Sequence, residues 1–302
     1  MATISQKIRN MSRIIDFHCH STVSDGLLTP DALVRHAKDC GIKVLALTDH
    51  DDVGGLALAR QTAEEEDIHF IDGVEISVTW KKRTIHIVGL NFNPHNEALK
   101  NALAKVRIDR DERAQEMAHG LAKAGIHGAY EGAKKFAGQS ILTRMHFAQF
   151  LIESGHAKNT KSVFKNYLVK GKPGFVDHQW MDLEQAVGLI KGAGGTAVVA
   201  HPGRYDLGMI NMHLFMHEFR SYGGGAVEVV TGSHQPPQFK QFATIAHRFD
   251  LKASRGSDYH GPGISYLEMG CLPELPAGCV PVWQDWPEVH AKLQQEADAL
   301  AA

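Results

Sequence analysis

Short apolar runs alternate with helical patterns along the chain. The segment "RIIDFHCH" predicts a strand by its β-branched start, and "IKVLALTDH", "RTIHIVGLNF", "GTAVVAHP" and "GAVEVVT" predict further strands. Between strands, segments such as "TPDALVRHAKDCG" and "DLEQAVGLIKGAG" carry helical periodicity. Strands that alternate with helices indicate parallel strands and an α/β fold. About seven such units fit a closed or distorted (β/α)7 barrel better than a two-layer fold.

The middle of the chain breaks this alternation. Residues 95–172 contain no clear strand and carry helical periodicity instead, as in "SILTRMHFAQFLIESG". We therefore expect a helical insertion at 95–172, of the size of a small domain, over the mouth of the active site. The barrel is then discontinuous and is built from 12–94 and 173–302, while residues 1–11 form a polar leader.

Composition and charge narrow the class of protein. Of the 302 residues, 43% are hydrophobic and 22% are charged, which is typical of a globular protein. The net charge of −2 predicts no general attraction to nucleic acid. The four cysteines form no CxxC pair and are expected to be reduced thiols in the cytoplasm. No apolar stretch approaches the ~20 residues of a membrane span, and no obligate protein partner is indicated.

Ionisable side chains gather at the ends of the predicted strands. In "IIDFHCHSTVSDG", alternation puts Asp16, His18 and His20 on one face of the first strand, and Asp25 follows in its loop. Barrels build their active sites at the C-terminal ends of the strands. The other strand ends carry further candidates, namely Asp49, His50, Asp51, Glu75, His86, His201, Asp258 and His260.

So many imidazoles and carboxylates are costly to bury without partners, and a metal centre would supply those partners. Mixed imidazole and carboxylate ligation suits Mn, Fe or Zn, and two or three ions are needed to use so many ligands. Closely spaced ions clamp the attacking and leaving oxygens in phosphoryl hydrolysis. Histidines outside this pattern, such as His36 and His247, are expected to be surface or core residues without a chemical role.

The same motifs carry a family resemblance. In order and spacing, "DFHCHSTVSDG", "ALTDHDDVGG", "GVEIS", "AHPGRY" and "GSDYH" resemble the successive motifs of the PHP (polymerase and histidinol phosphatase) family. The resemblance runs from Ile14 to Pro273 and includes the insertion. There, "SILTRMHFAQFLIESG" and "NYLVKGKPGFV" are similar to the subgroup that acts on nucleoside 3′,5′-bisphosphates and short 5′-phosphorylated RNA. One departure is "DDVGGL", where relatives often show a Thr and a single Gly, but it leaves the ligands intact.

The resemblance implies a distorted, TIM-like barrel with two or three divalent cations, Mn²⁺ first and Fe²⁺ or Zn²⁺ as alternatives. Carried over by motif, the catalytic metal ligands are His18, His20, Glu75 and Asp258 for one ion, Asp25, His50 and His260 for a second, and Glu75, His86 and His201 for a third. Asp16 would orient a histidine through its second nitrogen, and Asp49 or Asp51 would do the same for His50.

The reaction that the resemblance favours is hydrolysis of a phosphate monoester, in which a hydroxide bridging two ions attacks phosphorus. The expected substrate is a nucleoside 3′,5′-bisphosphate, such as adenosine 3′,5′-bisphosphate, which would lose its 3′-phosphate to give AMP. The guanidinium of Arg144 fits a phosphate bidentately. His146 could contact phosphate or protonate the leaving oxygen, and Lys172 and Arg204 are candidates for the second phosphate. A structural role is the alternative for each of these cations.

Three other functions stay open. A 5′-3′ exoribonuclease acting on short 5′-phosphorylated RNA would use related chemistry, because the bond attacked also lies beside a 3′-oxygen. A histidinol-phosphate phosphatase would need only one phosphate pocket and no insertion bearing Arg144. A non-catalytic, metal-stabilised binding module is the third, although all nine expected ligands are present. The net charge of −2 favours small substrates over long nucleic acid.

Overall fold

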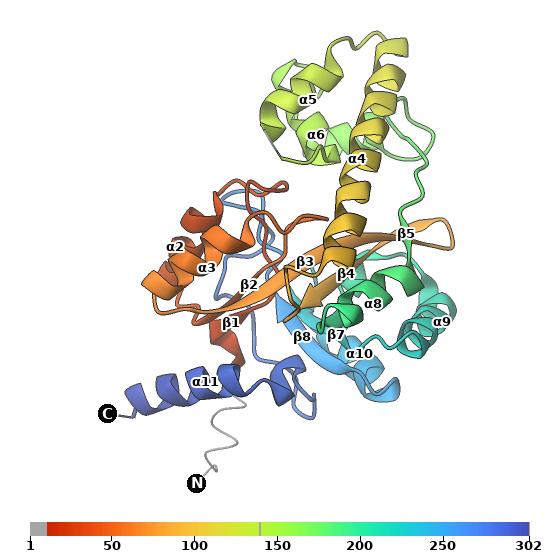
Figure 1. The fold of residues 1–302 in the computed structure, drawn as a ribbon. Helices are drawn as coiled ribbons and strands as arrows, with labels where there is room; N and C mark the ends of the chain where they lie inside the picture. The colour runs from red at the N-terminus through yellow and green to blue at the C-terminus, as the bar shows by residue number, and fades with distance from the viewer. Residues whose placement is uncertain (1–10, 139, 302) are drawn as a thin grey trace.

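The computed structural model describes residues 11–138 and 140–301, so nearly all of the predicted leader lies outside the described residues. Its strands form one curved sheet in the order β1-β2-β3-β4-β6-β7-β8, with β5 beside β3 (Figure 1). The first and last strands of this order meet, because the Phe17 amide donates to the Arg255 carbonyl at 3.1 Å. The nearly closed, seven-stranded sheet with its helices confirms the predicted distorted barrel.

The strands are β1 (Ile15–Asp16), β2 (Val44–Leu47), β3 (His69–Trp80), β4 (Arg83–Leu90), β5 (Met181–Asp182), β6 (Thr196–Val199), β7 (Ala226–Thr231) and β8 (Lys252–Gly256). Most neighbours are parallel, but β4 is antiparallel to both β3 and β6. The cause is the two-residue hairpin at Lys81 and Lys82, both with positive φ, because so short a turn joins only antiparallel strands.

The helices fall into two groups. Those that follow strands of the barrel are α2 (Pro30–Asp39), α3 (Leu56–Glu65), α8 (Leu183–Gly192), α9 (Gly208–Ser221), α10 (Pro236–Arg248) and α11 (Pro287–Ala299). Those between β4 and β5 are α4 (Glu97–Lys123), α5 (Ala129–Ala137), α6 (Arg144–Glu153), α7 (Thr160–Val163) and the short π-helix η2 (Phe164–Leu168). In Figure 1, α5, α6 and one half of α4 project away from the sheet.

The apolar side chains form separate clusters in the barrel and around Phe147, and Leu99 and Leu103 at the start of α4 belong to the barrel. In the barrel, Phe17 packs edge-on against Trp283 and Trp286, with ring centroids 5.7 and 5.5 Å apart. Between β4 and β5, side chains of α4, α5 and α6 surround Phe147 in a cluster of their own. None of the described helices is both long and apolar enough to cross a membrane.

The aromatic packing around Phe17 generates a stability prediction. Because Phe17 is fully buried, Phe17→Ala should lower the free energy of unfolding by about 3–5 kcal/mol. Ile210→Ala is the matched control, since its side chain is 85% exposed, and it should change that free energy by less than about 0.5 kcal/mol. Urea unfolding followed by circular dichroism measures both. Equal midpoints for the two variants would contradict the packing argument.

Candidate metal centre

Four predicted ligand atoms meet at the end of the barrel. The Nε2 atoms of His18 and His20 lie 3.2 Å apart. Glu75 Oε2 lies 3.4 and 3.3 Å from these two nitrogens, and Asp258 Oδ1 lies 3.6 and 3.4 Å from them. Four ligands at about 2.1 Å from a tetrahedral cation are spaced by about 3.4 Å. The ligand atoms of His18, His20 and Asp258 all lie within 4.8 Å of one another, and Glu75 Oε2 approaches the same two nitrogens, so each carboxylate oxygen has the spacing of a ligand to a cation shared with this histidine pair.

The remaining predicted ligands surround this group. Asp25 Oδ1 lies 3.4 Å from His260 Nε2 and 3.8 Å from His50 Nε2. The other oxygen of Glu75, Oε1, lies 2.8 Å from His86 Nδ1 and 2.9 Å from His201 Nε2. Glu75 therefore reaches two neighbouring positions with its two oxygens, as the motifs imply.

The ligand sets overlap more than the motifs suggest. His20 also lies with Asp25, His50 and His260 in one group of ligand atoms within 4.8 Å of one another, and His50 lies with Glu75 and His86 in another. His50 Nδ1 is only 2.9 Å from Glu75 Oε2. Each of these two histidines thus has access to two of the three positions.

Two buried oxygens test whether these residues fit a cation. Glu75 Oε2 and Asp25 Oδ1 are buried and lie close to imidazole nitrogens, but neither accepts a hydrogen bond from any of the described residues. A buried carboxylate oxygen without a partner costs free energy, and a cation bound between these ligands would remove that cost. The donor set of nitrogen and oxygen atoms suits Mn²⁺, Fe²⁺ and Zn²⁺ alike.

Burial and charge set the protonation of the histidines in the metal-free protein. Burial, followed by His260 and His50, lowers the pKa of His20 to about 3, so this imidazole is neutral. Burial opposes the charged form of His260 too, but Asp25 and Asp258 raise its pKa to about 9. The pKa of His18 is likewise raised, because Glu228, Glu75 and Asp258 outweigh burial. His18 and His260 therefore carry protons that a bound cation must displace.

Asp16 has a different partner from the one expected. Its Oδ1 accepts hydrogen bonds from the backbone amides of Ser257 at 2.8 Å and His18 at 3.2 Å. It therefore joins the ends of β8 and β1 through the backbone. Among the described residues no histidine ring binds to it, because the strand ends leave unpaired amides closer to its carboxylate.

Asp49 and Asp51 also bind groups other than the His50 ring. Asp49 accepts hydrogen bonds from the hydroxyls of Ser21 and Ser24, both at 2.6 Å. Asp51 accepts from the Ser77 amide at 2.8 Å and pairs with Arg110. Among the described residues neither aspartate binds His50, so both hold the loops that carry the ligands.

The carboxylate that orients a ligand ring is Glu228, which the sequence reasoning missed. Glu228 Oε1 lies 2.7 Å from His18 Nδ1, and Oε2 accepts from the His201 amide at 2.6 Å. Such a carboxylate fixes the ring and raises its basicity. The only signal in the sequence is a single charged residue inside the apolar run "GAVEVVT".

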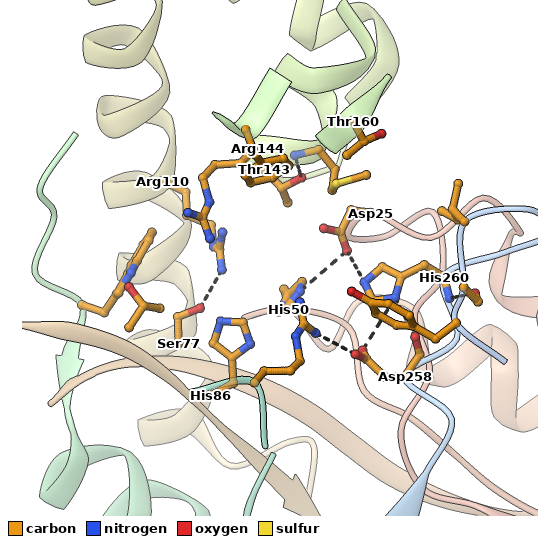
Figure 2. Close-up of a pocket in the computed structure, with 18 of the residues that line it drawn as sticks. Asp25, His50, Ser77, His86, Arg110, Thr143, Arg144, Thr160, Asp258 and His260 are labelled. Atoms are coloured by element: carbon orange, nitrogen blue, oxygen red, sulfur yellow. Dashed lines mark hydrogen bonds and ion pairs between the residues drawn. The ribbon is translucent and has the colours of Figure 1, made fainter. Parts of the chain in front are cut away.

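A cavity of about 590 Å³ opens over this cluster (Figure 2). On one side it is lined by Asp25, His50, His86, Asp258 and His260. The same cavity is lined by Arg110, Arg113, Arg144, Lys161 and Trp180, and Figure 2 shows Arg110 and Arg144 across it from Asp258. One cavity thus combines a cluster of metal-ligating side chains with a group of cations.

The structure brings two of the four predicted substrate-binding residues to this cavity. Arg144 lines it beside Phe164, and Arg204 lines it while donating to Asp258 Oδ2 at 2.8 Å. His146 is buried at the start of α6, where its Nδ1 accepts from the Thr143 amide at 3.2 Å. Lys172 is exposed on the turn after η2 and does not line the cavity.

Sequence reasoning missed Arg110 and Arg113, which extend from α4 toward the cavity. Arg110 is buried and pairs with Asp51. Arg113 Nε is buried and has no hydrogen-bond partner in the part of the chain that the structure describes. Burial, followed by the charges of Arg144 and Arg110, lowers the pKa of Arg113 to about 9. A helical pattern does not show which arginines face a cavity, so no sequence signal could have found them.

Comparisons with known proteins agree on one family. The PHP domain model matches residues 16–222. A 3′,5′-nucleoside bisphosphate phosphatase of Chromobacterium violaceum is 45% identical over 285 residues, which cover 94% of this chain and 99% of that protein. The 5′-3′ exoribonuclease Rnm of Escherichia coli strain K12 is 42% identical over 289 residues, with 95% and 98% covered.

A solved structure has the same fold. It is an amidohydrolase from Chromobacterium violaceum with bound sulfate and no metal. Its TM-score is 0.87 at 45% identity, over 92% of this chain and 96% of that one.

The contact between Glu228 and His18 generates a metal-binding prediction. Glu228→Gln keeps the shape of the side chain but removes the charge behind His18, and should weaken metal affinity by about 10- to 100-fold. Glu184→Gln, an exposed position on α8, should leave metal affinity unchanged. Competition with a chelator, read by elemental analysis, measures both. Equal affinities for the two variants would show that Glu228 does not support the centre.

The protons on His18 and His260 predict a pH dependence. A cation must displace them, so apparent metal affinity should rise as pH rises from neutral toward the His260 pKa of about 9. Metal titration should also release protons into a weakly buffered solution. Calorimetry in buffers of different ionisation enthalpy measures that release. An affinity independent of pH would contradict the assigned protonation.

Proposed function

The chain belongs to the PHP-domain family of phosphoesterases, and we propose that it hydrolyses the 3′-phosphate of nucleoside 3′,5′-bisphosphates. The relative from Chromobacterium violaceum that carries this activity in its name is matched over 99% of its length. The expected product from adenosine 3′,5′-bisphosphate is AMP with free phosphate. The four described cysteines are free, which favours a cytoplasmic location.

The observation that carries the proposal is the shared cavity. The cavity is lined by the ligand cluster and also by the cations Arg110, Arg113, Arg144 and Lys161. Arg113 Nε has no hydrogen-bond partner within residues 11–138 and 140–301, and burial and the charges of Arg144 and Arg110 lower the pKa of Arg113 to about 9. A second phosphate would relieve that repulsion. A substrate with two phosphates satisfies both sides of the cavity at once.

We propose that the cluster holds two or three divalent cations, with Mn²⁺ first and Fe²⁺ or Zn²⁺ as alternatives. Bound cations supply positive charge for the phosphate oxygens and lower the pKa of water. Side chains of the protein would bind the two phosphates. Arg204, fixed by Asp258, lies beside the ligand cluster, where it can bind the phosphate that reacts. Arg113 and Arg144 would hold the 5′-phosphate, since a guanidinium pairs with phosphate through two hydrogen bonds.

A second candidate function is 5′-3′ exoribonuclease activity on short 5′-phosphorylated RNA. It rests on the relative from Escherichia coli, which is matched over 98% of its length. The same arginines would hold the 5′-phosphate, and the bond attacked would again lie beside a 3′-oxygen. Histidinol phosphate has a single phosphate and gives the cations across the cavity nothing to bind.

Phosphate or nucleotide release from Mn²⁺-loaded protein separates these functions. We expect faster turnover of adenosine 3′,5′-bisphosphate than of histidinol phosphate or a short 5′-phosphorylated RNA. Faster turnover of the RNA would favour the exoribonuclease, and faster turnover of histidinol phosphate would overturn the two-phosphate assignment. No turnover of any of the three, with metal retained, would favour a binding module.

Arg144 gives a specific prediction for the second phosphate. Arg144→Ala should lower kcat/KM for adenosine 3′,5′-bisphosphate by about 10- to 100-fold, because a hydrogen bond to a charged group contributes about 1.5–3 kcal/mol. Hydrolysis of 3′-AMP, which lacks the 5′-phosphate, should change little. Lys172→Ala is the matched control, since Lys172 is exposed away from the cavity. An equal loss on both substrates with unchanged metal content would contradict a 5′-phosphate site at Arg144.

A further inference from the structure

We propose that His36, Cys40 and Glu268 bind a zinc-type divalent cation at a site separate from the catalytic cluster. His36 and Cys40 lie one helical turn apart at the C-terminal end of α2. Glu268 comes from the loop that follows β8. As a lone histidine, His36 was expected to have no chemical role, because Glu268 is 232 residues away and only the fold brings this carboxylate to it.

The distance from His36 Nε2 to Cys40 Sγ fits such a cation, whereas the distance from His36 Nε2 to Glu268 Oε1 is that of a hydrogen bond, which a bound cation would replace. Glu268 Oε1 lies 2.8 Å from His36 Nε2, and Cys40 Sγ lies 3.7 Å from the same nitrogen. All three ligand atoms lie within 4.8 Å of one another. With Zn–N near 2.1 Å and Zn–S near 2.3 Å, tetrahedral ligation spaces nitrogen and sulfur by about 3.6 Å. Three protein ligands with a fourth position left to water is a common zinc arrangement.

The backbone holds the loop in place for this contact. Gly270 has φ of +75°, and a Cβ there would lie 2.4 Å from the Cys40 carbonyl oxygen. The loop can therefore pack directly on the end of α2 only because this residue is glycine. The Cys271 amide donates to the Glu268 carbonyl at 3.2 Å and closes the turn, while Met269 is buried. Glu268 thus approaches the helix from an ordered turn.

The site also lies directly behind the catalytic cluster. The His36 ring stacks on Tyr259, with centroids 5.1 Å apart and planes inclined by 19°. Tyr259 is buried and stands between two predicted metal ligands, Asp258 and His260. A cation bound to His36 would fix the His36 ring, which packs against Tyr259 beside the predicted ligands.

The competing explanation is a hydrogen bond between His36 and Glu268 alone, which would tie the loop to α2. In that case the Cys40 thiol takes no part. The thiol therefore distinguishes a cation site from a hydrogen bond. It also distinguishes this site from the catalytic cluster, whose predicted ligands offer only nitrogen and oxygen.

Co²⁺ is the probe, because thiolate ligation to Co²⁺ produces a charge-transfer absorption band that nitrogen and oxygen ligands lack. We expect the band in the full-length protein, with one more bound ion per chain than in Cys40→Ser. The band should be lost in Cys40→Ser and weakened in Glu268→Gln. Cys279→Ser, which removes a partly buried thiol that the proposal does not use, should keep it.

Absence of the band in the wild-type protein, or its persistence in Cys40→Ser, would overturn the proposal. Circular dichroism shows whether the variants fold, and Glu268→Gln changes a half-exposed side chain while keeping its shape. Phosphate release by the same preparations is a separate measurement. A protein that turns over no phosphate ester can still show the band, so this site and the proposed function fail independently.

Discussion

The structure depends on how the negative charge of a fully buried carboxylate, Glu75, is compensated. Its two oxygens lie within 3.4 Å of imidazoles from His18, His20, His50, His86 and His201. Removing a carboxylate from water costs several kcal/mol unless it is paired. The ends of the surrounding strands and the loops after them bring these imidazoles and their acidic partners to the same point. The cluster is therefore both a chemical centre and a constraint on the barrel.

The carboxylates around this centre divide into two kinds. Asp25, Glu75 and Asp258 face the imidazole nitrogens that would ligate a cation. Glu228 and Asp16 face away from that point and hold a ring or a backbone amide. The second kind keeps the ligands aimed when burial alone would let them rotate. A barrel that supplied only the first kind would leave its imidazoles without fixed orientation.

The helices between β4 and β5 contribute arginine side chains to the cavity. α4 is held to the barrel by Arg110, which pairs with Asp51 at a strand end. Arg113 lies one turn further along the same helix, and no described residue forms such a pair with it. The first arginine is neutralised and positions the helix, and the second keeps its charge for the cavity. Two residues of one type on one helix thus have different functions because only one of them meets an aspartate.

Much of this protein was determined by local sequence. Alternation along "IIDFHCH" places His18 and His20 on one face whatever surrounds the strand, and alternation of strands and helices defines the barrel. The partner of each buried group was decided only by the tertiary structure. Glu228 meets His18 across 210 residues, and Glu268 meets His36 across 232. A side chain's periodicity shows which face it occupies, but its partner depends on which strands and loops become neighbours when the sheet closes.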